Sequence, residues 1–304
     1  MIFAGTPDFA LASLTALVES GRTPVAVLTQ PDRPAGRGKK LTASPVKQYA
    51  ELQGIPVMQP VTLRDAGVVA ELEALQPDVM IVAAYGLILP QDVLDIPTHG
   101  CLNVHASALP RWRGAAPIQA AILAGDETTG ISLMAMTAGL DCGPVFHTSE
   151  VSIGDDETAG ELHDRLAALG GATLVEHLDD ILDGKLAAIE QDESFATYAA
   201  KIQKQDAEID WALPAAEIVR RVRAYNPFPG AFFFAADIRV KAWRAQVEEG
   251  SAAPGTVLQS DRDGIVIACG TGALRLIELQ LPGKRRATDR EFVGQLDLSE
   301  TRLA

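Results

Sequence analysis

Short apolar runs alternate with amphipathic stretches through the first 150 residues, and this alternation limits the chain to a few folds. Five apolar runs have the length of buried strands, namely Ile2–Ala4, Val25–Thr29, Val79–Ala84, Leu102–His105 and Ile131–Met136. Four stretches between them have helical spacing, namely Phe9–Glu19, Ser44–Gln53, Ala66–Leu75 and Pro117–Ala124. Strands that alternate with helices predict βαβ units and a doubly wound, mostly parallel sheet, which binds ligands at the carboxyl ends of its strands.

The second half of the chain changes character and predicts a smaller domain. Helical spacing continues over residues 156–182, whereas residues 187–205 carry mixed charge without a sustained strand. Short apolar runs then follow at hairpin-like intervals: Ala231–Phe234, Ile238–Ala245, Gly255–Leu258, Ile265–Cys269 and Leu274–Gln280. We therefore expect a catalytic domain over residues 1–186, a linker over 187–205 and a small β-barrel domain over 206–304.

The formal net charge of the 304-residue chain is −14, which argues at first against a nucleic-acid partner. The charge is unevenly distributed, however. Residues 1–205 hold 13 Lys and Arg against 26 Asp and Glu, whereas residues 206–304 hold 13 against 14. The acidity belongs to the first part of the chain, so the objection to an anionic partner is weakened.

Targeting and redox features point to one compartment. The first residues have neither the basic segment nor the cleavage site of a signal peptide, and the longest apolar runs are too short to span a bilayer. The three cysteines, Cys101, Cys142 and Cys269, form no close pair. We expect a cytoplasmic protein with no membrane segment and no zinc site.

Two polar side chains interrupt the apolar run Cys101–His105. Asn103 and His105 are two positions apart, so on a strand both project from the same face, while Leu102 and Val104 enter the other face. An amide and a protonated imidazole both donate hydrogen bonds, and such donors suit an oxygen that gains negative charge during a reaction. The pattern therefore indicates an oxyanion site and acyl transfer.

Asp141 is the candidate partner for His105, since a neighbouring carboxylate keeps an imidazole protonated near neutral pH. It follows the expected strand Ile131–Met136, in a loop where Gly139 and Gly143 allow a sharp turn back across the sheet. Without regard to their position, three such residues more often have a structural role, with Asn103 and His105 satisfying loop backbone and Asp141 in a turn. Their expected place at adjacent strand ends favours a functional site.

One long segment resembles the active-site segment of the methionyl-tRNA formyltransferases. It runs from Asn103 to Gln119 and reads NVHASALPRWRGAAPIQ. The likeness extends over essentially the whole chain and includes Phe3–Phe9, Thr29–Lys40, Ala84–Pro90 and Gly139–Asp141. Two departures are small: Ala106 and Ala108 stand where that family commonly has Gly and Leu, and the added β-carbon of Ala106 restricts the backbone beside the folate.

This resemblance implies a Rossmann-like formyltransferase domain with an OB-like C-terminal barrel. The implied reaction moves the formyl group of 10-formyltetrahydrofolate to the α-amino group of methionine on initiator methionyl-tRNA, as translation initiation requires. Asn103, His105 and Asp141 become the catalytic trio. The implied folate-binding residues are Tyr85, Gly86, Leu87, Ile88, Ser107, Ala108, Leu109, Pro110 and Leu140. No metal is implied, and we expect a monomer.

Two segments carry cations suited to tRNA phosphates. Residues 30–40 hold four cations and one acid, although composition alone favours a solvated surface loop. In residues 111–113, Trp112 can stack with a base or form a latch beneath the active-site loop. The resemblance places residues 30–40 near the acceptor end of tRNA, and we expect tRNA contacts from Arg33, Arg37, Lys39, Lys40, Arg111 and Arg113.

Several other functions remain open on the residues alone. A folate-linked formyltransferase acting on glycinamide ribonucleotide or an amino sugar shares the trio, and so does a formyltetrahydrofolate hydrolase. The basic residues 37–40, the segment 110–114 and the extra barrel favour tRNA. The acidic first part argues against a non-catalytic RNA-binding protein, and the lack of a G-x-G-x-x-G pattern after Gly5 argues against a nucleotide-binding oxidoreductase.

Overall fold

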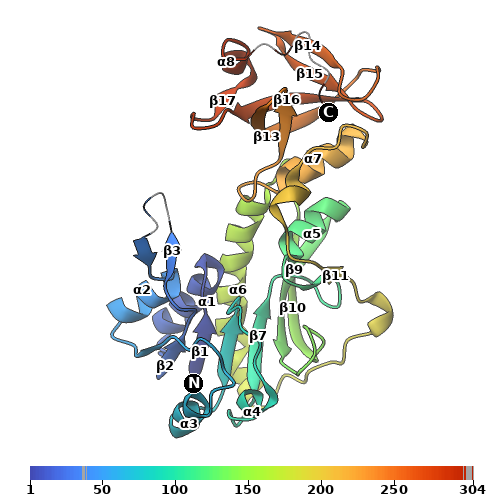
Figure 1. Cartoon of the computed structure of the whole chain (residues 1–304). Coiled ribbons are helices and arrows are strands. Elements are labelled where there is room, and N and C mark those ends of the chain that lie inside the picture. Colours follow the sequence, from blue (N-terminus) through green and yellow to red (C-terminus); the bar gives the residue numbers. More distant parts are fainter. Residues whose placement is uncertain (36–37, 39, 297, 299–302, 304) are drawn as a thin grey trace. The chain divides into compact units, whose positions relative to one another are not determined.

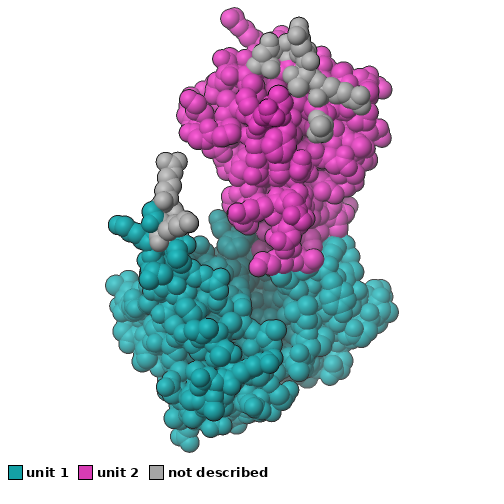
Figure 2. Space-filling model, viewed as in Figure 1, with its two compact units in different colours: residues 1–117, 128–152, 163–199 teal, residues 118–127, 153–162, 200–304 magenta. Residues whose placement is uncertain are grey.

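The computed structural model describes residues 1–35, 38, 40–296, 298 and 303 (Figure 1). It divides into two compact units (Figure 2). Unit 1 comprises residues 1–117, 128–152 and 163–199, and unit 2 comprises residues 118–127, 153–162 and 200–304. Most of helix α5 (Pro117–Ala124) and the first turn of helix α6 (Ala159–Leu182) thus belong to unit 2. The domain boundaries expected at residues 186 and 205 stay a prediction.

Unit 1 is built on a seven-stranded sheet of order β10-β9-β7-β6-β1-β2-β5. Its strands are β1 (Ile2–Gly5), β2 (Ala26–Leu28), β5 (Val57–Met58), β6 (Met80–Ala83), β7 (Cys101–His105), β9 (Thr128–Ala135) and β10 (Val145–Ser152). The five strands from β7 to β5 are parallel, whereas β9 runs antiparallel to β7, and β10 antiparallel to β9. The doubly wound, mostly parallel sheet is confirmed, with two antiparallel strands at one edge.

Helices lie on both faces of this sheet (Figure 1). On one face α6 packs closely against β7, because a Cβ placed on Gly170 would lie 3.0 Å from Cγ1 of Val104. The opposite face buries Met80 and Cys101 with apolar side chains of α3 (Ala66–Ala74) and α4 (Gln91–Leu94). Side chains that alternate along β7 therefore enter two different environments.

The strand order reverses at β1, which has β2 on one side and β6 on the other. Helix α1 (Asp8–Glu19) approaches β1 so closely that a Cβ on Gly5 would lie 2.6 Å from Cβ of Ala10. Beyond this glycine, Oγ1 of Thr6 donates a hydrogen bond to the carbonyl of Tyr85 at 2.9 Å. A reversal of this kind opens a crevice at the carboxyl ends of the strands, where doubly wound sheets bind ligands.

Shorter elements complete unit 1. Helix α2 (Pro45–Leu52) is capped by Ser44, whose hydroxyl accepts from the N–H of Lys47. Strands β3 (Arg33–Ala35) and β4 (Lys40–Thr42) form a small hairpin, and β8 (Arg113–Gly114) pairs in parallel with β11 (Tyr198–Ala199). The 3-10 helix η1 (Glu193–Phe195) precedes β11. Residues 191–199, expected as part of a linker, therefore contribute to unit 1.

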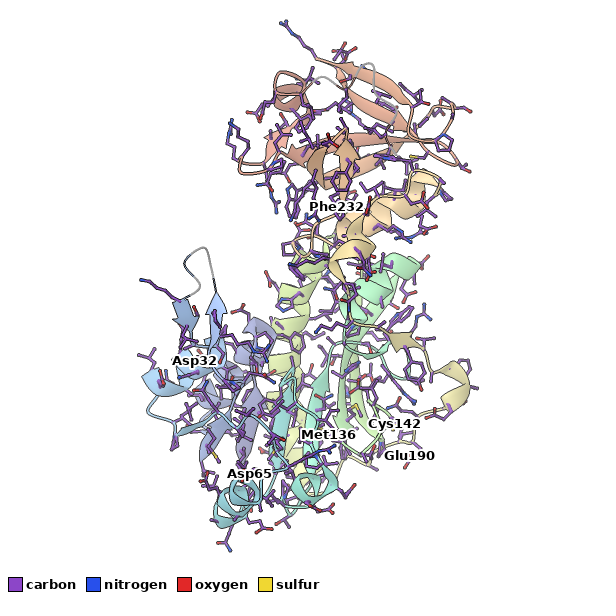
Figure 3. All side chains as sticks on the ribbon, in the orientation of Figure 1. Asp32, Asp65, Met136, Cys142, Glu190 and Phe232 are labelled. Carbon is purple, nitrogen blue, oxygen red and sulfur yellow. The ribbon has the colours of Figure 1, made fainter. Side chains whose placement is uncertain are left out.

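Unit 2 holds an antiparallel sheet of order β12-β13-β16-β15-β14, with β17 paired to β16. Its elements are η2 (Lys204–Ala207), α7 (Ala215–Ala224), β12 (Phe232–Ala235), β13 (Ile238–Glu248), β14 (Val257–Asp261), β15 (Gly264–Ala268), β16 (Ala273–Gln280), β17 (Ala287–Thr288) and α8 (Asp289–Val293). Phe232, labelled in Figure 3, is buried in the core with Phe233 and Trp211. The curled sheet is consistent with the expected OB-like barrel.

None of the helices within the described residues combines the length and the apolar character that crossing a membrane requires.

The strand β10 and helix α6 bring two imidazoles together, and this pair predicts acid sensitivity. The rings of His147 and His177 lie 3.9 Å apart between centroids. Burial, followed by the nearby His177, lowers the pKa of His147, and Glu176 opposes this shift. Below about pH 6.5, His147 binds a proton in the unfolded chain but stays neutral in the folded one. The free energy of unfolding therefore falls as the pH drops from about 6.5 through the lowered pKa of folded His147.

We expect His147→Gln to lose less stability than the wild-type chain between pH 7.5 and pH 5.5. Urea unfolding at both pH values measures the difference, with exposed His99→Gln as the control. Equal losses for wild type and His147→Gln would contradict the prediction.

Candidate active site

Asn103 and His105 lie side by side on the face of β7 that points away from α6. Their partners across the strands are Val82 on β6 for Asn103, and Ser132 on β9 for His105. Both residues are buried, with exposed fractions of 8% and 6%. Within the described part of the chain, the Asn103 side chain makes no hydrogen bond, so its amide is available to a ligand.

The two nitrogens of His105 have different surroundings. Nε2 lies 3.1 Å from the carbonyl oxygen of Trp112. A carbonyl oxygen only accepts, so we assign the hydrogen of the neutral ring to Nε2. Nδ1 lies 3.8 Å from Oδ2 of Asp141, which is too far for a direct hydrogen bond but within ion-pair distance when the ring is protonated. Nδ1 is therefore the ring nitrogen that faces Asp141.

Asp141 reaches His105 by a different route from the one expected. Because β9 is antiparallel to β7, it ends at Ala135 opposite Leu102, near the start of β7 rather than its end. The expectation of two adjacent strand ends is therefore wrong. The loop between Met136 and Cys142, both labelled in Figure 3, returns across the sheet, and Oδ2 of Asp141 accepts from the N–H of Gly114 at 2.8 Å.

The backbone at Gly114 requires glycine. Its φ is +116°, and a Cβ would lie 2.6 Å from the carbonyl oxygen of Ala199 on β11. This close approach belongs to the β8–β11 pairing, which also fixes the direction of the N–H that holds Asp141. The carboxylate is therefore held by main chain rather than by a mobile side chain.

A segment that the sequence did not flag holds this site together. Nε2 of Gln191 donates to the carbonyls of Asp141 and Gly143 at 2.9 and 2.7 Å. Oγ1 of Thr197 accepts from the N–H of Trp112 at 2.9 Å. Both residues fall in the expected linker, where polar composition gave no signal of a long-range contact.

The segment after β7 carries four of the folate-binding candidates. The hydroxyl of Ser107 donates to the carbonyl of Arg111 at 2.6 Å, and the N–H of Leu109 donates to Oγ of Ser132 at 3.1 Å. Ala108 and Pro110 are half-buried. This segment is thus a tied loop at the carboxyl end of β7.

The other folate candidates lie in two further loops. Tyr85 is 2% exposed and packs in the core, while Gly86 (φ +85°) and half-buried Leu87 follow it. Ile88 and Leu140 are 84% and 62% exposed. Large aliphatic side chains with such exposure at the ligand edge of a sheet provide apolar surface for a ring system.

The basic hairpin β3–β4 is anchored at its base by an ion pair. Nζ of Lys47 lies 2.9 Å from Oδ2 of Asp32, which is labelled in Figure 3, and 2.8 Å from Oε1 of Gln59. The Lys47 ammonium and then the Gln59 amide hold the pKa of Asp32 below its ordinary value. Arg33 and Lys40 are exposed on the hairpin. Arg37 and Lys39 lie outside the described residues.

The two arginines around Trp112 have different environments. The Arg111 side chain is exposed, and its guanidinium lies 4.3 Å from the centre of the Trp112 ring. Arg113 is 1% exposed, and its guanidinium donates to Gln191 and Glu193 at 2.7–3.0 Å. The expected tRNA contact from Arg113 is therefore corrected, because its donors are used inside the protein.

Two further features lie away from this site. Burial raises the pKa of the Cys101 thiol to about 12, which keeps it protonated near neutral pH. In unit 2, Arg220 and Arg223 line a cavity of about 460 Å3, and their guanidinium groups donate to backbone carbonyls at 2.7–3.2 Å. No cluster of three or more His, Cys, Asp or Glu suited to a metal ion occurs in the residues that the structure describes.

The fold and this site define a formyl transferase. Residues 1–178 match the family model described as formyl transferase, and residues 201–296 match the one described as its C-terminal domain. A methionyl-tRNA formyltransferase of Aromatoleum aromaticum is 55% identical, with 98% of this chain and 94% of the relative covered. One from Chromobacterium violaceum is 52% identical, with 100% and 99% covered. The chain belongs to the methionyl-tRNA formyltransferase family.

Solved structures share the fold at low identity. An N-formyltransferase of Helicobacter canadensis, in complex with folinic acid and dTDP-3-aminofucose, superposes with a TM-score of 0.68 at 18% identity and covers 90% of this chain and 97% of its own. HypX of Aquifex aeolicus in complex with tetrahydrofolic acid gives 0.64 at 18% identity, with 97% of this chain and 46% of its own covered. These likenesses concern the fold alone.

The Tyr85 hydroxyl predicts a stability effect. Within the described structure this hydroxyl is buried without a hydrogen-bond partner, and burial raises its pKa above the ordinary value. A buried polar group left unpaired is destabilising, so we expect Tyr85→Phe to raise the free energy of unfolding by about 1 kcal/mol. Urea unfolding at pH 7.5 measures the change. A loss of more than about 1 kcal/mol would mean that the hydroxyl has a partner.

Proposed function

We propose that the chain transfers the formyl group of 10-formyltetrahydrofolate to the α-amino group of methionine on initiator methionyl-tRNA. The product is formylmethionyl-tRNA, which is used in translation initiation. The observation that carries the proposal is the buried pair Asn103 and His105, with a free amide beside an imidazole that faces Asp141 at 3.8 Å, in a chain 55% identical to a methionyl-tRNA formyltransferase.

In the proposed reaction, the uncharged methionyl amine attacks the formyl carbon, and the carbonyl oxygen becomes an oxyanion. The Asn103 amide and the protonated Nδ1 of His105 donate hydrogen bonds to this oxygen, because Nε2 is already bound to the Trp112 carbonyl. The bond from the formyl carbon to N10 of the folate then breaks. N10 gains a proton, and the amine loses one.

Asp141 has an electrostatic role in this scheme. Its carboxylate pairs with the protonated His105 ring of the proposed mechanism and, held by the Gly114 N–H, lies where it can take the amine proton directly or through water.

For the folate we propose a site formed by residues 85–88, residues 107–110 and Leu140. The exposed Ile88 and Leu140 side chains support it, since the pterin ring needs apolar surface.

For the tRNA we propose contacts from Arg33, Arg37, Lys39, Lys40 and Arg111. The support is the charge of residues 30–40 and the resemblance described above. We also propose a monomer, from that same resemblance, and a location in the cytoplasm, from the targeting and cysteine features of the sequence.

The substrate is tested by measuring formyl transfer from 10-formyltetrahydrofolate to a panel of amines. The panel contains Met-tRNA, uncharged tRNA, free methionine, glycinamide ribonucleotide and a dTDP-linked amino sugar. We expect transfer to Met-tRNA alone, because only Met-tRNA offers both a primary amine and a phosphate backbone long enough to meet residues 30–40. Transfer to one of the small amines, with none to Met-tRNA, would sink the proposal.

The oxyanion role is tested with Asn103→Ala. Loss of one oxyanion donor lowers turnover by roughly 10²–10³-fold, so we expect kcat to fall by that factor. The circular dichroism spectrum should be unchanged, because within the described structure the Asn103 side chain makes no hydrogen bond that the fold needs. A kcat within about threefold of wild type would remove Asn103 from the mechanism.

A further inference from the structure

Gln191 connects two parts of the site that are far apart in the sequence. Its Nε2 donates to the carbonyls of Asp141 and Gly143, and its Oε1 accepts from Nε and Nη2 of Arg113 at 3.0 and 2.9 Å. A side-chain amide has two donors and two acceptor lone pairs. Gln191 uses all four, so its side chain has one orientation.

Arg113 determines that orientation. A guanidinium only donates, so the atom of Gln191 that faces it must be the amide oxygen, and the NH2 group then faces the Asp141 loop. The guanidinium is itself held by Glu193, whose carboxylate oxygens lie 2.7 and 2.9 Å from its nitrogens. Arg113 holds the pKa of Glu193 below its ordinary value, so this ion pair is formed at neutral pH.

Both ends of Asp141 depend on this network. At the backbone, Gln191 binds the carbonyl of Asp141, a residue held at a φ of +48° that few side chains favour. At the carboxylate, Oδ2 accepts from the N–H of Gly114, the residue that follows Arg113. A shift in Gln191 would therefore move the Asp141 carboxylate relative to Nδ1 of His105.

We infer that Gln191 is a positioning residue that sets the separation of Asp141 and His105 and thereby the rate of transfer, without taking part in substrate binding. This inference rests on the proposed function. It assigns an activity role to a residue outside both the trio and the proposed folate and tRNA sites.

The first test is Gln191→Met, which keeps the length of the side chain and removes all four hydrogen bonds. A displacement of about 1 Å at a reacting group can lower rates by up to about 100-fold, so we expect kcat to fall about 10–100-fold. KM for the folate and for Met-tRNA should each stay within about twofold of wild type. The matched control is Gln53→Met, the same change at an exposed position after α2.

The second test is Gln191→Glu, which keeps an acceptor for Arg113 but places a negative charge beside the Asp141 loop. A nearby negative charge raises the pKa of a carboxylate and of an imidazole alike. The mechanism uses Asp141 as a carboxylate and His105 as a protonated ring, so we expect the acidic and the alkaline limb of the kcat profile both to move to higher pH. No such rise is expected in Gln191→Met or in the control Gln53→Glu. An NMR titration of the His105 ring, assigned with His105→Gln, should show the same shift without any substrate.

The outcomes separate this inference from the proposed function. Wild-type protein that formylates no amine in the panel contradicts the proposed function, and the NMR titration then still tests the coupling of Gln191 to His105. Active wild type with unchanged kcat in Gln191→Met overturns the inference, as does a raised KM at unchanged kcat. If Gln191→Met is insoluble, Gln191→Asn, which keeps the amide but shortens its reach, gives the same comparison.

Discussion

The site depends on strand β7 being paired along both edges, parallel to β6 and antiparallel to β9. Because hydrogen bonds along both edges hold β7 in the pleated conformation, its side chains alternate between the two faces of the sheet. Leu102 and Val104 take the face covered by α6, and Asn103 and His105 take the other. A slip of one residue would drive an amide and an imidazole against α6, so burial on that face fixes the register and with it the chemistry.

The direction of β9 has a second consequence for the position of the Asp141 carboxylate. Asp141 leaves the sheet near the start of β7, and its loop must fold back to reach His105. The backbone is strained on both sides of that contact: φ is +48° at Asp141 and +63° at Trp112. Such conformations cost of order 1–3 kcal/mol each and persist where neighbouring bonds over-determine them. Gln191 and Thr197 supply those bonds.

Most of the fold of unit 1, but only part of the candidate site, could be predicted from the sequence. Apolar period and length located strands β1, β2, β6 and β7 and helices α1, α2, α3 and α6, since burial on a sheet acts on consecutive residues, whereas the short helix α4 was not predicted. Strand direction was out of reach, because a buried apolar run such as residues 131–136 reads the same in either direction. The two-residue spacing of Asn103 and His105 fixed their common face, which needs no tertiary information.

The hydrogen-bond network around Gln191 could not be predicted from the sequence for another reason. Its partners Arg113 and Asp141 lie 78 and 50 positions away, and single polar side chains produce no periodicity. The wrong prediction of a tRNA contact for Arg113 has the same cause. The sequence does not distinguish an arginine that binds a phosphate from an arginine that pairs with a carboxylate inside the protein. Only the packing seen in the structure distinguishes the exposed Arg111 from the buried Arg113.

Charge explains how an acidic chain is compatible with an anionic substrate. At physiological ionic strength the screening length is about 8 Å, so carboxylates farther away act weakly on a bound phosphate. Many acids of unit 1 are also paired, as Asp179 is with Arg22 at 2.6 Å and Asp32 with Lys47. What an approaching tRNA meets is therefore set by the nearest exposed side chains. On the β3–β4 hairpin these include Arg33 and Lys40, while the single acid at its base, Asp32, is neutralised by Lys47. The net charge of the chain thus predicts its solubility and the sign of its long-range field, whereas the proposed tRNA contacts depend on a few cations held on a short hairpin.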